Sequence, residues 1–549
     1  MSLLSKRTIK QVLGEIPLAA EVFWQLRQQG KPLSKSFSMR RTEKRLLEWR
    51  AQAQAARKNG APWGSSGRQI LIFATLRYWI EHAALMGLAL AGQGHAVTLA
   101  YLPYANWRKP LNRFDLRRQN AYARSLLGKA APLMHAISFL DVKPAGEPLP
   151  PALLEAVEAI SLRDAQYTLQ VEDVDRTGEL YRLRLERNIQ AARAALARMQ
   201  ANRPEVVVTP NGSILEMGAV YQAARWLGIP VVTYEFGEQS QRIWLAHNSE
   251  VMRQETDRLW EKRKQRPLTS GQWEQARALF VSRQRASLWE NFTRRWQGAP
   301  SQGGKQARQA LGLDARPVVL LAANVIGDSL TLGRQVFTDS MTEWLERTVL
   351  DFARRPQAQL VVRIHPGERY TQGPSVADIV RRALPNIPAH IHLVAAGDPI
   401  NTYDLVEIAD LGLVYTTTVG MEMAMSGAPV IPTGQTHYRG KGFTLDPTSW
   451  QDYFELLEQV LADPKGYRLP QEQVELAWNY AYRFFFEYPC PFPWHLLHFW
   501  EELESWPMQR VLSDEGQATF GKTFRYLAGD ARDWSEEFPQ PEALEGKML

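Results

Sequence analysis

Polar residues suited to binding a phosphate follow an apolar stretch within residues 359–368, QLVVRIHPGE. The stretch QLVV has the composition of a buried strand, and it leads into Arg363, His365 and Glu368. Pro366 restricts His365 to an extended backbone, and a histidine held in this way can supply a proton or stabilise developing charge. Arg363 adds a guanidinium, which favours phosphate. The pattern predicts an anion site at a strand end.

The same pattern recurs at further strand ends in this half of the chain. Buried strand patterns lead into three more polar clusters: Asn324 and Asp328, then Thr416, Thr417 and Thr418, then Gly434, His437 and Tyr438. Lys441 adds a cation between glycines, which let a backbone approach a ligand closely. One such cluster is common by chance, whereas four in succession indicate a ligand site.

The three threonines separate a strand pattern from a helix pattern. Free N–H groups at a helix N-terminus bind anions, and the hydroxyls add donors, so a mono- or diphosphate would fit there. Ordinary N-capping by a threonine explains the same pattern. Glu422 lies about one helical turn later, where its carboxylate could accept two ribose hydroxyls. The simpler alternative is an exposed helical glutamate.

The first half of the chain has fewer candidates at its strand ends, namely Arg77, Asn211 and Glu235. In VVTYEFG, Glu235 stands where a buried strand opens, and a carboxylate there could take a proton from an acceptor hydroxyl. The alternative is a glutamate neutralised by the basic residues that follow. Asn211 belongs to an Asn-Gly pair, which is also a common turn.

Metal ligands are weakly represented. The one D-x-D, Asp173 to Asp175, lies in a polar stretch, and His390 and His392 alternate along a strand pattern without a third ligand. No HExxH, P-loop or G-x-S-x-G motif occurs. We therefore expect no metal and no cofactor.

Two blocks of strand–helix–strand patterns position these residues. We expect an α/β protein of GT-B-like architecture, with two Rossmann-like doubly wound domains facing a cleft and ligands at the carboxyl ends of the strands. The expected ranges are a basic helical arm (1–60), a first α/β domain (61–245), a helical connector (246–315), a second α/β domain (316–465) and an aromatic helical tail packing back on the domains (466–549).

The motifs NVIGDS, VVRIHPGE, VYTTTVGMEMAMSGAPVI and YRGKGFT resemble the capsule polysaccharide biosynthesis proteins, GT-B-fold glycosyltransferase-like proteins of bacterial surface carbohydrate synthesis. The resemblance covers about residues 316–446 well and the first domain loosely. The HP pair, the hydroxyl-rich turn and the helical glutamate are also similar to Kdo transferases, bacterial sialyltransferases and glycerol phosphate polymerases, which share a cytidine-linked donor. One departure is that TTT stands where many relatives carry a serine pair.

The resemblance implies roles for individual residues. His365 would contact the donor phosphate, Thr416 to Thr418 would hold it, and Glu422 would hold the ribose. The first domain would bind the acceptor and supply the base. The full set of predicted residues is catalytic Glu235 and His365; donor-binding Asn324, Asp328, Arg363, His365, Glu368, Thr416, Thr417, Thr418, Glu422, Gly434, Tyr438 and Lys441; and acceptor-binding Arg77 and Asn211.

The resulting prediction is a metal-independent glycosyltransferase. It would move a sugar from a nucleotide-sugar donor, CMP-linked by the resemblance, to a bacterial surface polysaccharide or its lipid-linked precursor. The alternatives are a CDP-glycerol-type phosphotransferase or a UDP-sugar epimerase on the same scaffold, and a non-catalytic nucleotide-sugar-binding assembly protein. Fold does not separate them, because function depends on the site.

Composition limits the compartment and the partners. The 549 residues are 45% hydrophobic and 22% charged, with one cysteine, Cys490, which excludes an internal disulfide and a cysteine-rich zinc site. No apolar run approaches the roughly 18–20 residues of a membrane span, and the N-terminus lacks a signal-peptide pattern. We expect a cytoplasmic protein.

The positive charge is concentrated at the N-terminus. Residues 1–60 contain 13 Lys or Arg and 4 Glu, a net of +9, whereas the whole chain has +7. This arm, with Phe23 and Trp24, either contacts an anionic membrane surface peripherally or is a solvated helical arm packed on the body. Nucleic acid is not an expected partner, because the rest of the chain is near neutral.

Overall fold

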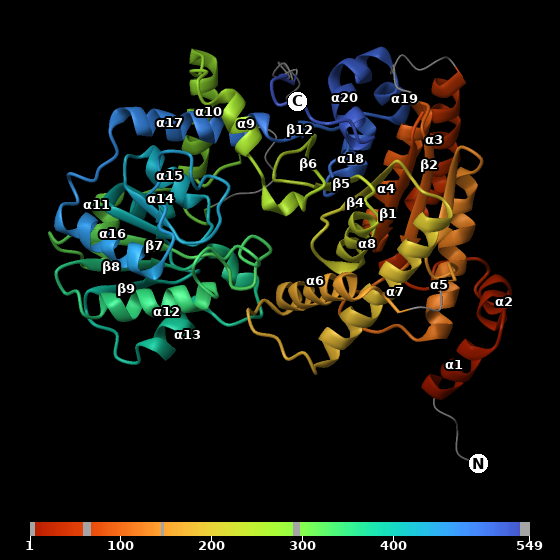
Figure 1. The fold of residues 1–549 in the computed structure, drawn as a ribbon, viewed down its shortest axis with the longest axis horizontal. Coiled ribbons are helices and arrows are strands. Elements are labelled where there is room, and N and C mark those ends of the chain that lie inside the picture. The colour runs from red at the N-terminus through yellow and green to blue at the C-terminus, as the bar shows by residue number, and fades with distance from the viewer. Residues whose placement is uncertain (1–5, 59–66, 144–147, 289–296, 539–549) are drawn as a thin grey trace. The chain divides into compact units, whose positions relative to one another are not determined.

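The computed structural model describes residues 6–58, 67–143, 148–288 and 297–538. The chain divides into two compact units, and Figure 1 labels their elements. The first unit consists of residues 1–165, 175–252 and 489–549, and the second of residues 166–174 and 253–488. Each unit contains one sheet.

The sheet of the first unit has seven strands in the order β12-β6-β5-β4-β1-β2-β3. Five of them are parallel: β1 (Gln69–Thr75), β2 (Ala96–Leu102), β3 (Met134–Ser138), β4 (Val206–Pro210) and β5 (Val231–Glu235). They follow the Rossmann order 3-2-1-4-5. Two strands that we did not predict, β6 (Arg242–His247) and β12 (Cys490–Pro491), extend the sheet in antiparallel fashion.

Helices cover the strands of the first unit. They are α1 (Lys6–Glu15), α2 (Ala19–Leu26), α3 (Arg40–Lys58), α4 (Arg77–Gly92), α5 (Arg113–Leu127), α6 (Pro151–Leu169), α7 (Glu179–Ala201), α8 (Leu215–Trp226), α18 (Phe499–Ser505), α19 (Met508–Val511) and α20 (Asp514–Leu527). β1 and β4 are almost entirely buried, as expected for parallel strands covered on both faces.

The sheet of the second unit has five parallel strands in the order β11-β10-β7-β8-β9. They are β7 (Val318–Ala322), β8 (Gln359–Arg363), β9 (Ile391–Val394), β10 (Leu411–Val414) and β11 (Val430–Pro432). Numbered within their own sheet, they repeat the order 3-2-1-4-5. The prediction of two Rossmann-like doubly wound α/β domains is therefore confirmed.

The helices of the second unit are α9 (Asp257–Arg263), α10 (Ser270–Gln284), α11 (Gly304–Leu311), α12 (Met341–Phe352), α13 (Val376–Ala383), α14 (Thr402–Ile408), α15 (Val419–Met425), α16 (Trp450–Ala462) and α17 (Gln471–Tyr482). Glu172 also belongs to this unit, although it lies far from the other residues in sequence. Its carboxylate accepts hydrogen bonds from the N–H groups of Met341 and Thr342, 2.8 Å each. These bonds cap the N-terminus of α12.

The unit boundaries differ from the expected ranges because apolar side chains join distant segments. The expected arm is part of the first unit: Trp49 of α3 is buried in its core, and α3 packs on α4. The aromatic tail is divided at Tyr488. Phe484 stacks on His437 in the second unit, with ring centroids 3.8 Å apart, whereas Phe492 belongs to the core of the first. The expected linker, residues 61–66, lies outside the described residues.

Candidate functional site

The carboxyl edge of the second sheet brings together several predicted residues. In the Rossmann order, β7 and β10 are the neighbours at which the connections change sides, and ligands bind there. Asn324, just after β7, accepts a hydrogen bond from the backbone N–H of Thr416, just after β10, at 3.1 Å. Thr416 is buried, and its hydroxyl has no hydrogen-bond partner among the described residues. A buried hydroxyl of this kind can bond to a ligand or a water.

Tyr438 and Gly434 close this corner of the site. The hydroxyl of Tyr438 donates to the carbonyl oxygen of Thr417, 2.6 Å away. A Cβ on Gly434 would lie 2.8 Å from the Cγ2 of Thr416, so only glycine fits between the ends of β10 and β11. Both residues therefore shape the loop around the threonines.

The threonine run has the expected place before α15. Thr418 is the N-cap residue and forms no side-chain capping bond, whereas the hydroxyl of Thr417 is 3.5 Å from the backbone nitrogen of Val419. A hydrogen bond of this length is weak. Capping therefore does not fully engage the hydroxyls of the run.

Arg363 is a buried cation that forms no ion pair among the described residues, although the charge of Asp398 acts on it. Its side chain is at the end of β8 and is 4% exposed. It donates to the hydroxyl of Thr402 at 3.3 Å and to the carbonyl oxygen of Ala395 at 2.8 Å. Burial lowers the pKa of Arg363 to about 10. Because an unpaired buried charge is costly, this guanidinium favours an anionic ligand.

Three other residues predicted for this site, His365, Glu368 and Asp328, already have hydrogen-bond partners within the protein. The N–H of Gly367 donates to Nδ1 of His365 at 3.0 Å, which orients the half-buried imidazole ring. Glu368 accepts bonds from the hydroxyl of Ser375 at 2.8 Å and the N–H of Val376 at 2.9 Å, so it caps α13. Asp328 likewise accepts a bond from the N–H of Leu330 at 3.2 Å. Both carboxylates thus have local structural partners.

Glu422 is buried rather than exposed, so the simpler alternative for this residue is wrong. It forms a close ion pair with Arg283 of α10. Burial raises the pKa of the Glu422 carboxyl, while Arg283 and the hydroxyl of Tyr403 oppose that rise. The guanidinium of Arg283 lies 4.6 Å from the centre of the Phe485 ring. A ribose at Glu422 would have to share this carboxylate with Arg283.

Lys441 is also buried, and its ammonium forms a close ion pair with Asp257 of α9. Its charge is therefore already neutralised. The structure does not bring it into contact with Arg363 or the threonines through any described hydrogen bond.

In the first unit, the structure brings Asn211 and Glu235 together. The amide of Asn211 donates to Oε2 of Glu235 at 3.1 Å, and the N–H of Phe236 donates to Oε1 at 3.0 Å. Burial raises the pKa of the Glu235 carboxyl. Asn211 has φ of 57°, a left-handed conformation that asparagine tolerates well. A carboxylate with a raised pKa at a strand end is suited to accept a proton.

Arg77 has a different partner. At the start of α4, its guanidinium pairs with Glu81 one turn later, at 2.9 Å. Glu81 also accepts a hydrogen bond from the hydroxyl of Thr42, at 2.7 Å. The described contacts do not join Arg77 to Asn211 or Glu235.

The sequence did not indicate that Arg283, Thr402 and Tyr403 contact the predicted residues of the second unit. Arg283 lies in a stretch read only as a polar helical connector, and nothing in its local pattern separates it from other surface arginines. The fully buried cluster of Arg184 with Asp164 and Glu216 in the first unit was also not predicted. Charged residues along a helix such as α7 usually form a solvated face, so nothing in the sequence indicated that Arg184 is buried.

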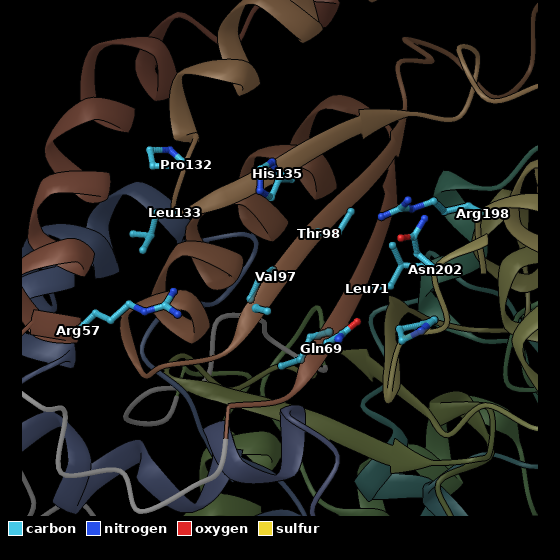
Figure 2. A pocket seen from close by; sticks show the side chains of 13 residues that line it. Arg57, Gln69, Leu71, Val97, Thr98, Pro132, Leu133, His135, Arg198 and Asn202 are labelled. Atoms are coloured by element: carbon cyan, nitrogen blue, oxygen red, sulfur yellow. The ribbon is translucent and has the colours of Figure 1, made fainter. Parts of the chain in front are cut away.

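A cavity of about 280 Å³ lies at the opposite, amino-terminal edge of the first sheet. Figure 2 shows Arg57, His135 and Arg198 around it, from α3, β3 and α7. Its lining contains no carboxylate and none of the predicted site residues. Among the described residues, no group of three or more His, Cys, Asp or Glu is arranged to hold a metal ion.

In the parts of the chain that the structure describes, no helix combines the length and the apolar character needed to cross a membrane.

Comparisons with known proteins show only distant similarity. No protein-family model matches the chain, and no curated protein matches it. Among solved structures, the chain is similar to the β-Kdo 2,4-transferase KpsC of Thermosulfurimonas dismutans, with 17% identity over 50% of this chain and 79% of that one, and a TM-score of 0.32. It is also similar to the UDP-GlcNAc 2-epimerase of Neisseria meningitidis, with 13% identity over 76% and 98% of the two chains and a TM-score of 0.24. Values this low assign no function.

Proposed function

We propose that the chain is a glycosyltransferase that moves a sugar from a nucleotide-sugar donor to a bacterial surface polysaccharide or its lipid-linked precursor. The observation that carries the proposal is the buried Arg363, which forms no ion pair among the described residues, at the same sheet edge as the unpartnered hydroxyl of Thr416. Together they provide a cation and a donor at the place where doubly wound sheets bind nucleotides.

In the proposed reaction, the bond from the sugar's anomeric carbon to the donor phosphate breaks as a bond to an acceptor oxygen forms. Negative charge develops on the leaving phosphate, where Arg363, His365 and Thr416 stabilise it. Glu235 takes the proton of the acceptor hydroxyl. The nucleotide leaves with the phosphate, and no metal is required for the charge balance of this step.

The donor nucleotide is the finer part of the proposal. The HP pair, the threonine run and Glu422 match the motifs shared by enzymes with cytidine-linked donors, and we propose a CMP-linked sugar on that basis. Arg283 has a direct consequence for it. Arg283 already binds the carboxylate of Glu422. The ribose hydroxyls can therefore bind this carboxylate only if the ion pair breaks, or if the carboxylate oxygens accept hydrogen bonds from both groups.

Thermal melts with CMP, CDP, UDP and GDP test the proposal. A ligand at 100 times its Kd stabilises the folded state by about 2.7 kcal/mol, which a melt detects. We expect stabilisation by a cytidine nucleotide, its loss in Arg363→Met, and its retention in Arg381→Met, a control on an exposed arginine of the same unit.

Each other outcome has a defined meaning. Preference for UDP or GDP would keep the nucleotide site and refute the cytidine donor. The absence of stabilisation by any of the four nucleotides would contradict the glycosyltransferase proposal. Equal stabilisation of wild type and Arg363→Met would remove Arg363 from the site.

A further inference from the structure

Exposed apolar side chains are concentrated near the N-terminus. The described residues include 18 large hydrophobic side chains that are exposed, and seven of these lie within residues 9–26. They are Ile9, Val12, Ile16, Leu18, Val22, Phe23 and Leu26, with Leu18 67% and Leu26 72% exposed. A soluble surface usually carries such residues singly. We call residues 9–26 the apolar hairpin.

The exposed side chains lie on one side of each helix. Ile9 and Val12 of α1 are three residues apart and Ile16 follows just beyond its end, whereas Leu18 directly precedes α2 and Val22 and Leu26 lie within it, four residues apart. Side chains at these spacings share a helix face. The two helices therefore present apolar faces to solvent.

The opposite faces hold the hairpin firmly on the first unit. α1 and α2 pack on α5, and Figure 1 shows them beside it. Lys10 pairs with Asp115 at 2.8 Å, and Trp24 is buried with its indole N–H donating to the carbonyl oxygen of Lys31 at 3.0 Å. Phe23 packs edge-on against Phe114 at 5.5 Å. The exposed apolar face is thus fixed in place by the fold.

The structure changes which residues of the predicted N-terminal arm could contact a membrane. Trp24, expected to contact a membrane, faces inward, and the aliphatic residues of the hairpin face outward instead. Periodicity alone did not identify them, because the arm is interrupted between the two short helices.

The charge around the hairpin is positive. Its two acidic residues, Glu15 and Glu21, are both paired with arginines of α5, Arg113 and Arg117. Arg27, Lys31 and Lys35 follow the hairpin and are exposed. The exposed aliphatic side chains are therefore followed in the sequence by exposed cations, with no unpaired carboxylate among the described residues of this stretch.

We infer that the apolar hairpin binds the surface of an anionic phospholipid bilayer, with α1 and α2 lying in the plane of the interface. Aliphatic faces flanked by cations bind such surfaces through buried apolar area and attraction to anionic lipids. A protein partner is disfavoured, because protein interfaces are enriched in aromatic residues and depleted in lysine. The inference is independent of the proposed reaction.

Co-flotation of the full chain with liposomes tests it. We expect binding to vesicles of 70% phosphatidylcholine and 30% phosphatidylglycerol, and about tenfold or more weaker binding to pure phosphatidylcholine, because the cations contribute to attraction. The triple variant Leu18→Glu, Val22→Glu and Leu26→Glu should lose flotation. All three positions are exposed, so the fold should tolerate the change.

The matched control places three glutamates at exposed apolar positions elsewhere: Leu497→Glu, Trp226→Glu and Leu350→Glu. It has the same net charge as the hairpin variant and should float like wild type. Equal loss in both triple variants, or no flotation of wild type, overturns the inference. A wild-type dimer that the hairpin variant converts to monomer in sedimentation, without vesicle binding by either, would assign the hairpin to a second copy of the chain and overturn it too.

Discussion

Each α/β unit has a buried glutamate in the first turn of the helix that follows its fourth parallel strand. Glu216 of α8 follows β4, and Glu422 of α15 follows β10. Each accepts a hydrogen bond from an arginine on a helix outside that strand–helix pair: Arg184 for Glu216, at 2.9 Å, and Arg283 for Glu422. Because both units have this arrangement, we infer that a glutamate at this position holds its helix against the helix that carries the arginine.

The two clusters differ in their balance of charge. Arg184 also pairs with Asp164, so one cation serves two buried carboxylates. Arg283 pairs with Glu422, interacts with the hydroxyl of Tyr403, and lies against Phe280 and Phe485. In the second unit, Glu422 is held by Arg283 and by the hydroxyl of Tyr403. The comparison shows that a fold position determines burial, and that the partners decide whether a residue remains available to a ligand.

The two units also differ in the charge that they place at the end of a strand. The first unit places a carboxyl with a raised pKa, Glu235, at the end of β5, and the second places a buried cation without an ion pair, Arg363, at the end of β8. One fold thus carries a buried carboxyl with a raised pKa in one copy and a buried guanidinium in the other, as expected when function depends on the site rather than on the scaffold.

The largest expected effect is the loss of turnover in Glu235→Gln. Removing a general base costs about 10²–10⁴ in rate, so kcat for sugar transfer from a donor built on the nucleotide that the melts select should fall by that factor. The matched control, Glu155→Gln on α6, changes an exposed glutamate of the same unit and should retain wild-type kcat. Turnover within a factor of about three of wild type would leave the base unassigned.

The pH dependence sharpens that assignment. Burial raises the folded-state pKa of Glu235 above its usual 4.5, so its stabilising contribution is complete below about pH 4.5 and is lost as pH rises through the folded pKa. Catalysis needs the ionised form, so activity should rise over the same range in which stability falls. Wild-type kcat/KM measured from pH 5 to 8 should show this limb, and the residual activity of Glu235→Gln should lack it.

Breaking the two ion clusters should have the next largest effect. Removing one partner of a buried pair costs about 3–5 kcal/mol, so both Arg184→Met and Arg283→Met should lower the midpoint of unfolding. Arg184→Met should be the more destabilising, because it leaves two carboxylates unpaired. Urea unfolding of each variant measures the difference.

A second variant separates charge from packing in the second unit. The double variant Arg283→Met, Glu422→Leu removes both charges of this ion pair. Much of the stability that Arg283→Met loses should therefore return. If the double variant is as unstable as Arg283→Met, the arginine contributes through its contacts with Phe280 and Phe485 instead.

Much of the fold could be predicted because its signals are local. RQILIFATL and PEVVVTPN correspond to β1 and β4, and the repeated strand–helix–strand order indicated parallel sheets. The strand ends of the second unit also carried their polar residues where expected. Long apolar runs and turn residues specify such elements within about ten residues of sequence.

The pairing of charged residues could not be predicted from the sequence. Arg283 and Glu422 are 139 residues apart in the chain, and Arg184 and Glu216 are 32 apart. Which arginine pairs with which carboxylate depends on how helices pack, and a short sequence pattern contains no information on that contact. The capping role of Glu368 was also missed, although its partners, Ser375 and Val376, are only seven and eight residues away at the start of α13.

A third buried glutamate, Glu502 of α18, extends the comparison, because no arginine pairs with it among the described residues. Its carboxylate accepts hydrogen bonds from the N–H groups of Gln241, at 2.9 Å, and His495. Burial raises its pKa to about 7. Glu216 and Glu422 have a guanidinium beside them, whereas Glu502 has only backbone dipoles.

The smallest expected effect is therefore a pH-dependent one. Because the folded pKa of about 7 exceeds the usual 4.5, the protonated form of Glu502 stabilises the fold fully below pH 4.5, and this contribution is lost as pH rises through 7. Glu502→Gln resembles the protonated form, so the decline in unfolding free energy from pH 5 to 8 should shrink by about 1–3 kcal/mol. Glu501→Gln, at a neighbouring residue with an 84% exposed side chain, should reproduce the wild-type decline. Parallel curves for all three proteins would mean that backbone N–H groups alone keep a buried carboxylate ionised, and that the arginines beside Glu216 and Glu422 are not needed for that purpose.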